Sequence, residues 1–515
     1  MSLYSAGRAR RALFDTIGFR AISQVSSVLG YVVLVRALSE QTLGVFSLLY
    51  SVIPVIGTVA SLGLDQVLKR FQPEYLQAGD TRGATWLVRM VTVARLVSST
   101  AILALLLAAW NLVAPLFHLG GHRADFLLFS IVVLLYFQVA LLQISLASHM
   151  LHRYSVGSVA VLSCCKLITY FALWHAGALN LRSAIGSDAA AYALAYLFLV
   201  VMHRRLCRPE ADAPPYRPSV EQSRRLGRFA IASNFSDSGS LLLYTQTDNL
   251  FVGALMSPAA VGTYAFYARL NEMTANLVPI RLFENVVQPL LFAVRRDEAA
   301  EKLPRYFTLL VNINLLLQFP LIAFTIAYHR EIVQSAFGGK FVEYSAVLPL
   351  VISLAVSSNV FALPITMIAQ YAEKASLILR SQLFGIYQVA AMLLLIPVAG
   401  LYGAVIATGT LHLFRNLYVW WHVRDLARWR NWAAVAGVAA PIWLVATLAC
   451  LALKMLAHLP DLANMAIGAA VCAIAGVVHI RSEAISASDR EVLAGVLHGK
   501  EVAPLRWLGM LPRQA

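Results

Sequence analysis

Charged residues are scarce in this sequence of 515 residues, because only 13% are Asp, Glu, Lys or Arg whereas 59% are apolar. The mean hydropathy of +0.70 lies well outside the range of soluble globular proteins. This composition excludes a soluble protein and predicts an integral membrane protein.

The signatures of several catalytic and metal-binding classes are also missing. The five cysteines show neither a pairing pattern nor metal-ligand spacing, and two of them, Cys164 and Cys165, are adjacent. The sequence contains no glycine-rich phosphate loop and no Ser-His-Asp or Cys-His arrangement, and its twelve histidines are scattered. We therefore expect no disulfide framework, no metal and no cofactor.

Apolar runs recur from one end of the chain to the other. A helix of about 20 residues crosses the roughly 30 Å hydrocarbon layer of a bilayer, whereas a membrane β-strand would need strict alternation, which is not seen. The sequence thus predicts an all-α polytopic membrane protein with about 14 transmembrane helices. The candidate spans lie near 15–37, 42–63, 84–109, 125–149, 155–176, 184–203, 229–253, 259–280, 305–327, 343–370, 376–397, 400–422, 432–456 and 462–480.

The basic residues lie mainly in short loops between these runs. If the N-terminus is cytoplasmic, 27 lysines and arginines fall on the inside and six on the outside. This asymmetry predicts that both termini are cytoplasmic. Membrane topology therefore explains the net charge of +15, and nucleic acid is not an expected partner.

A short segment recurs with an offset of 218 residues from its serine onward. The segment Ala37–Phe46 returns as Ala254–Tyr264, with one residue inserted before the serine, and each copy lies between two apolar runs. Such a repeat predicts two six-helix lobes related by a pseudo-two-fold axis along the membrane normal. The predicted domains are an N-terminal lobe (1–203), a cytoplasmic linker (204–228), a C-terminal lobe (229–425), two further spans (426–480) and a cytoplasmic tail (481–515).

Ser219 and Gln222, at the end of the linker, have the spacing of a helix capping box, so a helix should begin there and lead into the seventh span.

Several local patterns, taken in order, resemble one family. They are the repeated segment, Gly63-Leu64-Asp65 to Arg70-Phe71, Glu74-Tyr75 with Gly79-Asp80, and the run from Leu395 to Ala404. Over about residues 10–425 the sequence resembles the polysaccharide transporter family, which includes O-antigen and exopolysaccharide flippases. That family belongs to the multidrug/oligosaccharidyl-lipid/polysaccharide exporter superfamily.

The resemblance implies two helical bundles around a cavity that opens alternately to either side of a bacterial inner membrane. It implies a polyprenyl-pyrophosphate-linked oligosaccharide as substrate, membrane lipids as surroundings, and a polysaccharide polymerase and chain-length machinery as partners. The family has no catalytic signature to carry over, so the candidate site residues come from the physics of the sequence.

Three basic residues, Arg95, Lys166 and Arg269, lie near the predicted membrane midplane. A charge there costs about 2.5–3.5 kcal/mol on insertion scales, so each must face a wet cavity or a partner. They are candidate substrate-binding residues, and structural pairing is the alternative. Three shallower arginines complete the candidate set, namely Arg20, Arg89 and the somewhat deeper Arg415. Snorkelling of the side chain to the membrane interface explains Arg20 and Arg89 equally well.

Two acidic residues are candidates for ion coupling. Asp237 lies in the seventh span, which is rich in polar residues, and its alternative role is in a helix kink stabilised by hydroxyl groups. Glu272 is three residues from Arg269, so a local ion pair is its alternative.

The function expected from these observations is that of a flippase for lipid-linked oligosaccharides in surface polysaccharide biosynthesis. An exporter of drugs or cations should have an anionic or aromatic cavity, whereas the deep charges here are mainly basic and favour a pyrophosphate. A membrane polymerase or glycosyltransferase needs catalytic groups in a sizeable outer loop, but the outer segments near 110–124 and 328–342 are short and lack a carboxylate pair. We therefore predict a transporter and not an enzyme.

Overall fold

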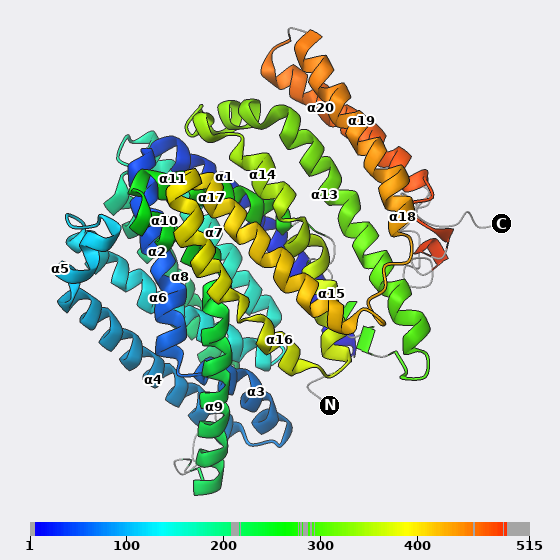
Figure 1. Ribbon diagram of the computed structural model, residues 1–515. Helices are drawn as coiled ribbons and strands as arrows, with labels where there is room; N and C mark the ends of the chain where they lie inside the picture. The colour runs from blue at the N-terminus through cyan, green and yellow to red at the C-terminus, as the bar shows by residue number, and fades with distance from the viewer. Residues whose placement is uncertain are drawn as a thin grey trace. The chain divides into compact units, whose positions relative to one another are not determined.

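The computed structural model describes residues 6–207, 216, 218–276, 278, 281, 287–288, 291–292, 294–456, 459–487 and 489–491. All regular elements within these ranges are helices and none is a strand, which confirms the all-α prediction (Figure 1). The chain divides into two compact units, Met1–Gly262 and Thr263–Ala515.

Eleven helices among the described residues are long and apolar enough to cross a membrane, so the chain is a multi-pass membrane protein. The expected spans 376–397 and 400–422 form one helical run that Gly400 interrupts with φ 56° and ψ −131°, a conformation that glycine adopts most readily. The expected spans 229–253 and 259–280 are not among the eleven. The count of fourteen therefore stays a prediction.

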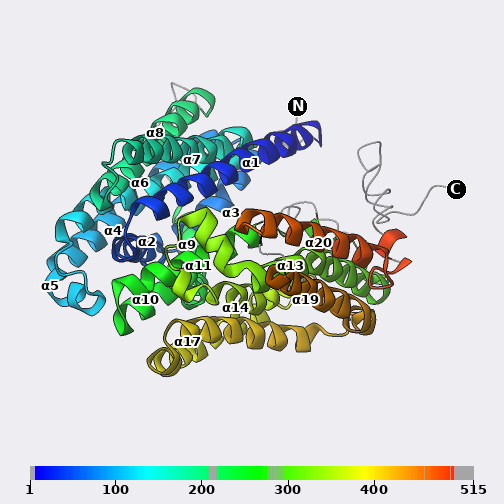
Figure 2. The ribbon, with the colours of Figure 1, turned by 90° about the horizontal axis from the view of Figure 1, so that it is seen from above.

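The first unit holds the helices up to the start of α11. They are α1 (Ala6–Ala37), α2 (Glu40–Ser61), α3 (Leu64–Gln77), α4 (Thr81–Ala108), α5 (Trp110–Val113), η1 (Ala114–Phe117), α6 (Arg123–Ser148), α7 (His152–His175), α8 (Leu181–Leu206), α9 (Val220–Ser240), η2 (Leu241–Leu243), α10 (Thr245–Leu255) and α11 (Pro258–Ala275), whose last residues belong to the second unit. Helix α7 packs between α1 and α8, and α6 packs on α8 (Figure 2).

Two breaks in the helices of the first unit position the site described below. Helix α2 ends where Leu62 and Gly63 both take left-handed backbone angles, and α3 then folds back along α4. Helix α9 begins at the predicted capping box, in which the Gln222 backbone N–H donates to Ser219 Oγ at 3.1 Å and the Ser219 N–H donates to Gln222 Oε1 at 2.9 Å. The seventh span then breaks at the short 3₁₀ turn η2, before α10.

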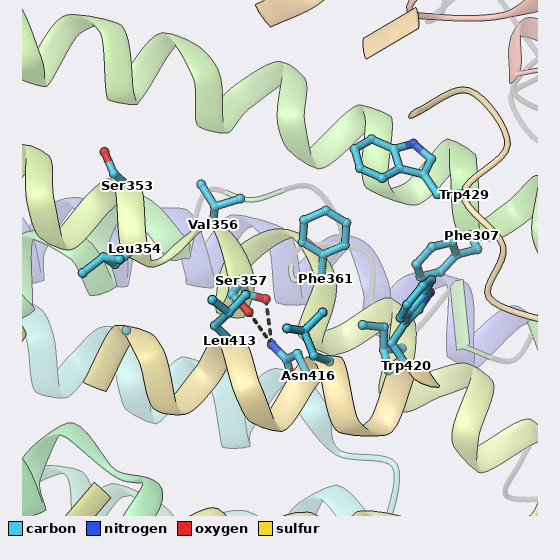
Figure 3. Close-up of a pocket in the computed structure, with 13 residues that line it drawn as sticks. Phe307, Ser353, Leu354, Val356, Ser357, Phe361, Leu413, Asn416, Trp420 and Trp429 are labelled. Atoms are coloured by element: carbon cyan, nitrogen blue, oxygen red, sulfur yellow. Dashed lines mark hydrogen bonds between the residues drawn. The ribbon is translucent and has the colours of Figure 1, made fainter. Parts of the chain in front are cut away.

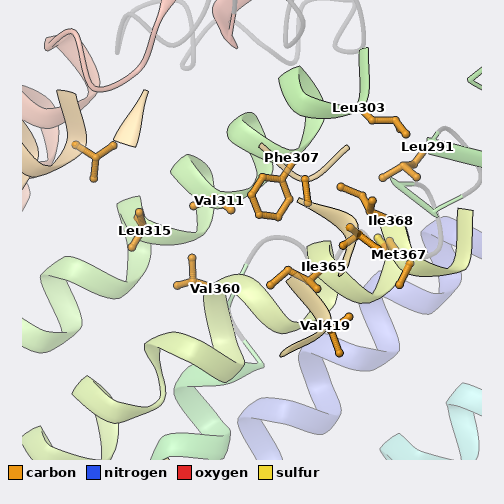
Figure 4. Close-up of a cluster of buried hydrophobic side chains, with 14 of the residues drawn as sticks. Leu291, Leu303, Phe307, Val311, Leu315, Val360, Ile365, Met367, Ile368 and Val419 are labelled. Carbon is orange, nitrogen blue, oxygen red and sulfur yellow. The ribbon is translucent and has the colours of Figure 1, made fainter. Parts of the chain in front are cut away.

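The second unit is built around a long helix, α13. Its further elements are η3 (Val342–Tyr344), α14 (Val347–Leu354), the π-turn η4 (Ser357–Phe361), α15 (Ala362–Tyr371), α16 (Ala375–Ser381), α17 (Phe384–Val423), α18 (Trp432–Ala434), the π-turn η5 (Val435–Ala439), α19 (Ala440–Leu456) and α20 (Asp461–Arg481), while α13 itself spans Ala299–Phe337. Helices α19 and α20, the two spans outside the predicted repeat, pack on each other and on α13. Phe307 and Val311 of α13 meet Val360, Ile368 and Val419 in a buried apolar cluster (Figure 4).

Candidate substrate and coupling site

Arg95 lies inside the first unit, on the buried face of α4, and only 2% of it is exposed. Its Nη1 donates to the Gly57 carbonyl oxygen at 2.7 Å, and its Nη2 lies 3.6 Å from Oδ2 of Asp65. The guanidinium carbon lies 4.1 Å from the centroid of the Phe137 ring, within the range of a cation–π interaction. These contacts match the structural alternative for Arg95, and direct contact with substrate stays a prediction.

Lys166 is held by a second, separate cluster in the same unit. Its Nζ lies 3.0 Å from Oδ1 of Asp188 and 3.3 Å from the Tyr50 hydroxyl. Asp188 is only 1% exposed and also accepts hydrogen bonds from the hydroxyls of Tyr50 and Tyr170, the latter at 2.6 Å. Burial of a charge in this way requires a partner and satisfied hydrogen bonds, which Asp188 has. Sequence reasoning missed Asp188, although an acidic residue inside an apolar span is a usable signal.

Two neighbouring carboxylates, Asp65 of α3 and Asp237 of α9, lie where these helices meet in the first unit. The Nε2 of Gln66 lies 3.4 Å from each carboxylate oxygen of Asp237, and Asp65 interacts electrostatically with both Arg95 and Asp237. The Oδ1 of Asp65 is buried and has no hydrogen-bond partner. Neighbouring carboxylates offer several oxygen ligands to a cation, which suits an ion-coupling role. Asp65 was not among the predicted site residues, but it belongs to the 63–71 pattern that carried the family resemblance.

Arg269 belongs to the second unit, where it is 43% exposed. Its Nη1 donates to Oε2 of Glu272 at 2.8 Å, so the ion pair expected from their spacing is present. Arg269 therefore keeps more open surface than the side chains of Arg95 and Lys166, which are 3% and 21% exposed.

Two arginines of the second unit lie near His412 of α17. The Nε of Arg415 donates to Ser381 Oγ at 3.2 Å, and His412 is in electrostatic range of both Arg415 and Arg281. No ion pair of Arg415 is found among the described residues. Guanidinium groups can donate paired hydrogen bonds to an anionic ligand, so these two arginines are candidates for binding a phosphate. Arg281 was not among the predicted site residues, because its position near a predicted cytoplasmic end is explained by snorkelling to the interface, and nothing in the sequence indicated its proximity to His412.

The two remaining candidates, Arg20 and Arg89, are exposed on α1 and α4. This exposure is compatible with either predicted role, since a snorkelling side chain and one that meets a substrate both reach a polar environment.

Comparisons with known proteins agree with this architecture. The structure is similar to the lipid II flippase MurJ in an inward closed conformation, with a TM-score of 0.64 and 12% identity, over 90% of this chain and 99% of that one. It is also similar to an inward-facing multidrug resistance transporter of the MATE family of the MOP superfamily, with a TM-score of 0.63 and 14% identity, over 80% of this chain and 98% of that one. Identities this low show the fold alone. A search of curated proteins found no match.

The sequence profile of one family, described as polysaccharide biosynthesis protein, matches residues 33–346, which is more than half of the chain. This confirms the family expected from the motifs. The chain therefore belongs to the polysaccharide biosynthesis protein family, and its fold is that of MurJ and the MATE transporters.

Proposed function

We propose that the protein is a flippase that moves a polyprenyl-pyrophosphate-linked oligosaccharide across the bacterial inner membrane by alternating access. The main support is a pair of arginines near His412, Arg281 and Arg415, in a multi-pass protein of a polysaccharide biosynthesis family. A pyrophosphate that leaves water needs paired N–H donors in place of its hydration, and guanidinium groups supply them. The transported glycan would serve the synthesis of O-antigen, exopolysaccharide or capsule.

Arg269 is the second substrate contact that we propose, since its half-exposed guanidinium can reach a ligand while its pair with Glu272 is retained. Asp237 and Glu272 remain the proposed ion-coupling residues, and Asp65 joins them because of its electrostatic interaction with Asp237. A polysaccharide polymerase and chain-length machinery are the proposed protein partners, and both termini are proposed to be cytoplasmic.

The test is deletion of the gene, followed by a search for a polyprenyl-linked glycan that accumulates in the cytoplasmic leaflet. The deletion strain is then complemented with Arg415→Ala, Arg415→Lys and, as a matched control, Arg82→Ala at the exposed start of α4. We expect export to be lost with Arg415→Ala, partly restored with Arg415→Lys and retained with Arg82→Ala, at equal protein abundance. Normal surface polysaccharide in the deletion strain would contradict the proposal, provided that no second flippase substitutes.

A second candidate function, export of a cationic compound, is favoured by one observation, the neighbouring carboxylates Asp65 and Asp237 in the first unit. The same deletion strain separates the two functions. If the protein exports cations, the deletion strain should be more susceptible to cationic drugs and its surface polysaccharide should be unchanged. If the protein is a flippase, the surface polysaccharide should be lost and the susceptibility to cationic drugs should be unchanged.

A further inference from the structure

A pocket of about 370 Å³ lies within the second unit, between α13, the α14–η4–α15 run and α17 (Figure 3). The side chains that line it include Phe307, Leu354, Phe361, Leu413, Trp420 and Trp429. Its volume falls in the range of about 300–1,000 Å³ that is typical of small-molecule sites. The π-turn η4 (Ser357–Phe361) forms part of its wall, and such turns are frequent at functional sites.

Four polar side chains that line this pocket, those of Ser357, Asn416, Trp420 and Trp429, hydrogen-bond to the protein itself. Nδ2 of Asn416 donates to the backbone oxygen of Ser357 at 2.8 Å and to its Oγ at 3.0 Å. The indole N–H of Trp420 donates to the Ala427 carbonyl oxygen at 2.9 Å, and that of Trp429 donates to Oδ1 of Asn312 at 3.2 Å. The pocket therefore offers ring faces and aliphatic carbon to a ligand. A ligand with polar groups would lose their hydration here, so the chemistry favours a hydrocarbon chain.

The pocket is elongated along α17. Its lining residues on this helix run from Gly409 to Trp420, which is about 16 Å at 1.5 Å per residue. Leu413 and Leu417 are 42% and 48% exposed, so the pocket reaches the surface of the unit along this helix. A flexible chain can enter such a pocket from the side, whereas a compact ring compound would fill only part of it.

One end of the pocket adjoins a basic segment. Trp429 lies within Arg424–Arg430, which carries three exposed arginines and a single carboxylate, Asp425. The guanidinium carbon of Arg424 lies 4.1 Å from the Trp421 ring centroid. An apolar pocket that ends at arginines is complementary to an amphipathic lipid whose anionic group adjoins its hydrocarbon chain.

We propose that this pocket binds the polyprenyl chain of the lipid-linked substrate, with the pyrophosphate at the arginines of 424–430. This inference rests on the proposed function, and it adds the site that holds the lipid while its head group enters the protein. Arg415 lies nine residues before Arg424 on the same helical run, about 14 Å along the axis, so the anionic group has a second cationic site within reach. An acyl chain of a bilayer phospholipid is the competing occupant.

Binding to the purified full chain tests the site without any export assay. A polyprenyl phosphate with a diazirine near the end of its chain is photolysed with the protein, and the labelled residues are mapped by mass spectrometry. We expect label on pocket residues such as Leu354, Phe361 and Leu413, and displacement of the probe by unlabelled polyprenyl phosphate but not by phospholipid. A diazirine phospholipid that labels the same residues equally, and that polyprenyl phosphate does not displace, would overturn the proposal.

A variant that fills the pocket supplies a second test. Leu413→Trp should reduce labelling by at least about tenfold, a loss of about 1.4 kcal/mol in binding free energy. The matched control is Leu394→Trp, on the same helix but away from the pocket and 70% exposed, which should label like the wild type. If Leu413→Trp does not fold, the competition experiment on the wild type decides alone.

The outcomes also separate this inference from the proposed function. Label that maps elsewhere, in a strain whose export depends on the protein, overturns the pocket assignment only. Absence of any label, together with normal export in the deletion strain, overturns the proposed function and the pocket assignment with it.

Discussion

Gly44 and Gly262 pack against each other at the crossing of α2 and α11. A β-carbon on Gly44 would lie 3.0 Å from the backbone nitrogen of Gly262, and one on Gly262 would lie 3.0 Å from the backbone nitrogen of Gly44. Each would also overlap a carbonyl oxygen, that of Pro258 for Gly44 and that of Glu40 for Gly262. The glycines of the two copies of the repeated segment thus contact each other reciprocally.

The first prediction follows from this contact. Gly44→Leu and Gly262→Leu should each reduce the yield of folded protein strongly and to a similar extent, because the obstructing atoms belong to backbone and cannot rotate away. The matched control is Gly186→Leu in α8, where a β-carbon meets nothing within 4 Å and the yield should be retained. Yield is measured by size-exclusion chromatography in detergent. A large loss for one of the repeated glycines and none for the other would show that the two copies are not equivalent.

The repeat could be predicted because the two copies share residues at the same local spacing. The same local residues indicate the turn before α2 and the turn before α11. Ser39 Oγ accepts from the Thr42 backbone N–H at 3.2 Å, and Ser257 Oγ accepts from the Ala260 N–H at 3.2 Å, so both copies place a serine cap ahead of the glycine. Helices and these caps form through interactions between residues no more than four positions apart. Such interactions can be recognised from the spacing of residues in the sequence.

The partners of the deep charges could not be predicted in the same way. Arg269 and Glu272 are three residues apart, and helix geometry alone brings them together. Arg95 meets Asp65, and Lys166 meets Asp188, only because α4 packs on α3 and α7 packs on α8. Apolar residues occur on every face of these membrane-spanning helices. The hydrophobic periodicity of the sequence therefore does not show which face of each helix meets its neighbour.

The second prediction concerns topology. In a cysteine-free background, Gly121→Cys lies in an exposed turn that we expect outside, and Gln77→Cys lies at the exposed end of α3 that we expect inside. A membrane-impermeant maleimide should label the first in intact spheroplasts and the second only after lysis, because positive charge is retained on the cytoplasmic side. The reverse pattern would contradict the proposed cytoplasmic termini.

The third prediction concerns pH. Hydrogen bonds from Arg225, at 2.7 and 3.1 Å, lower the pKa of the Glu74 carboxyl and join α9 to α3. Because the pKa is depressed in the folded state, this contact stabilises the protein above the unfolded pKa of about 4.3, and the stabilisation is lost as pH falls through the folded pKa. Arg225→Ala should therefore lower the melting temperature slightly at pH 7, by an amount that vanishes in acid, as expected for an exposed pair.

The control for this measurement is Arg228→Ala, which removes an exposed arginine three residues further along α9 and should give no pH-dependent difference. A melting-temperature difference for Arg225→Ala that stays constant from pH 7 to below the folded pKa would show that the packing of Arg225 on Phe71, and not the charge of Glu74, is responsible.

The last prediction compares a buried ion pair with an exposed one. Asp188→Asn leaves the Lys166 ammonium without its counter-charge in a site where Asp188 was only 1% exposed, and removing one partner of a buried pair costs about 3–5 kcal/mol. We expect the lower end of that range, because Lys166 is 21% exposed. The double variant Lys166→Met, Asp188→Asn should recover part of the loss, since no uncompensated charge then remains. Thermal unfolding in detergent measures both.

The exposed pair of Arg269 and Glu272 supplies the comparison, with 43% and 36% of the side chains exposed. Glu272→Gln should cost no more than about 1 kcal/mol, because water can solvate the arginine that remains. A cost this small would mean that Arg269 is held loosely enough to contact a substrate, whereas Lys166 is required mainly for the fold of the first unit. Equal destabilisation by Asp188→Asn and Glu272→Gln would contradict this distinction between a structural lysine and an available arginine.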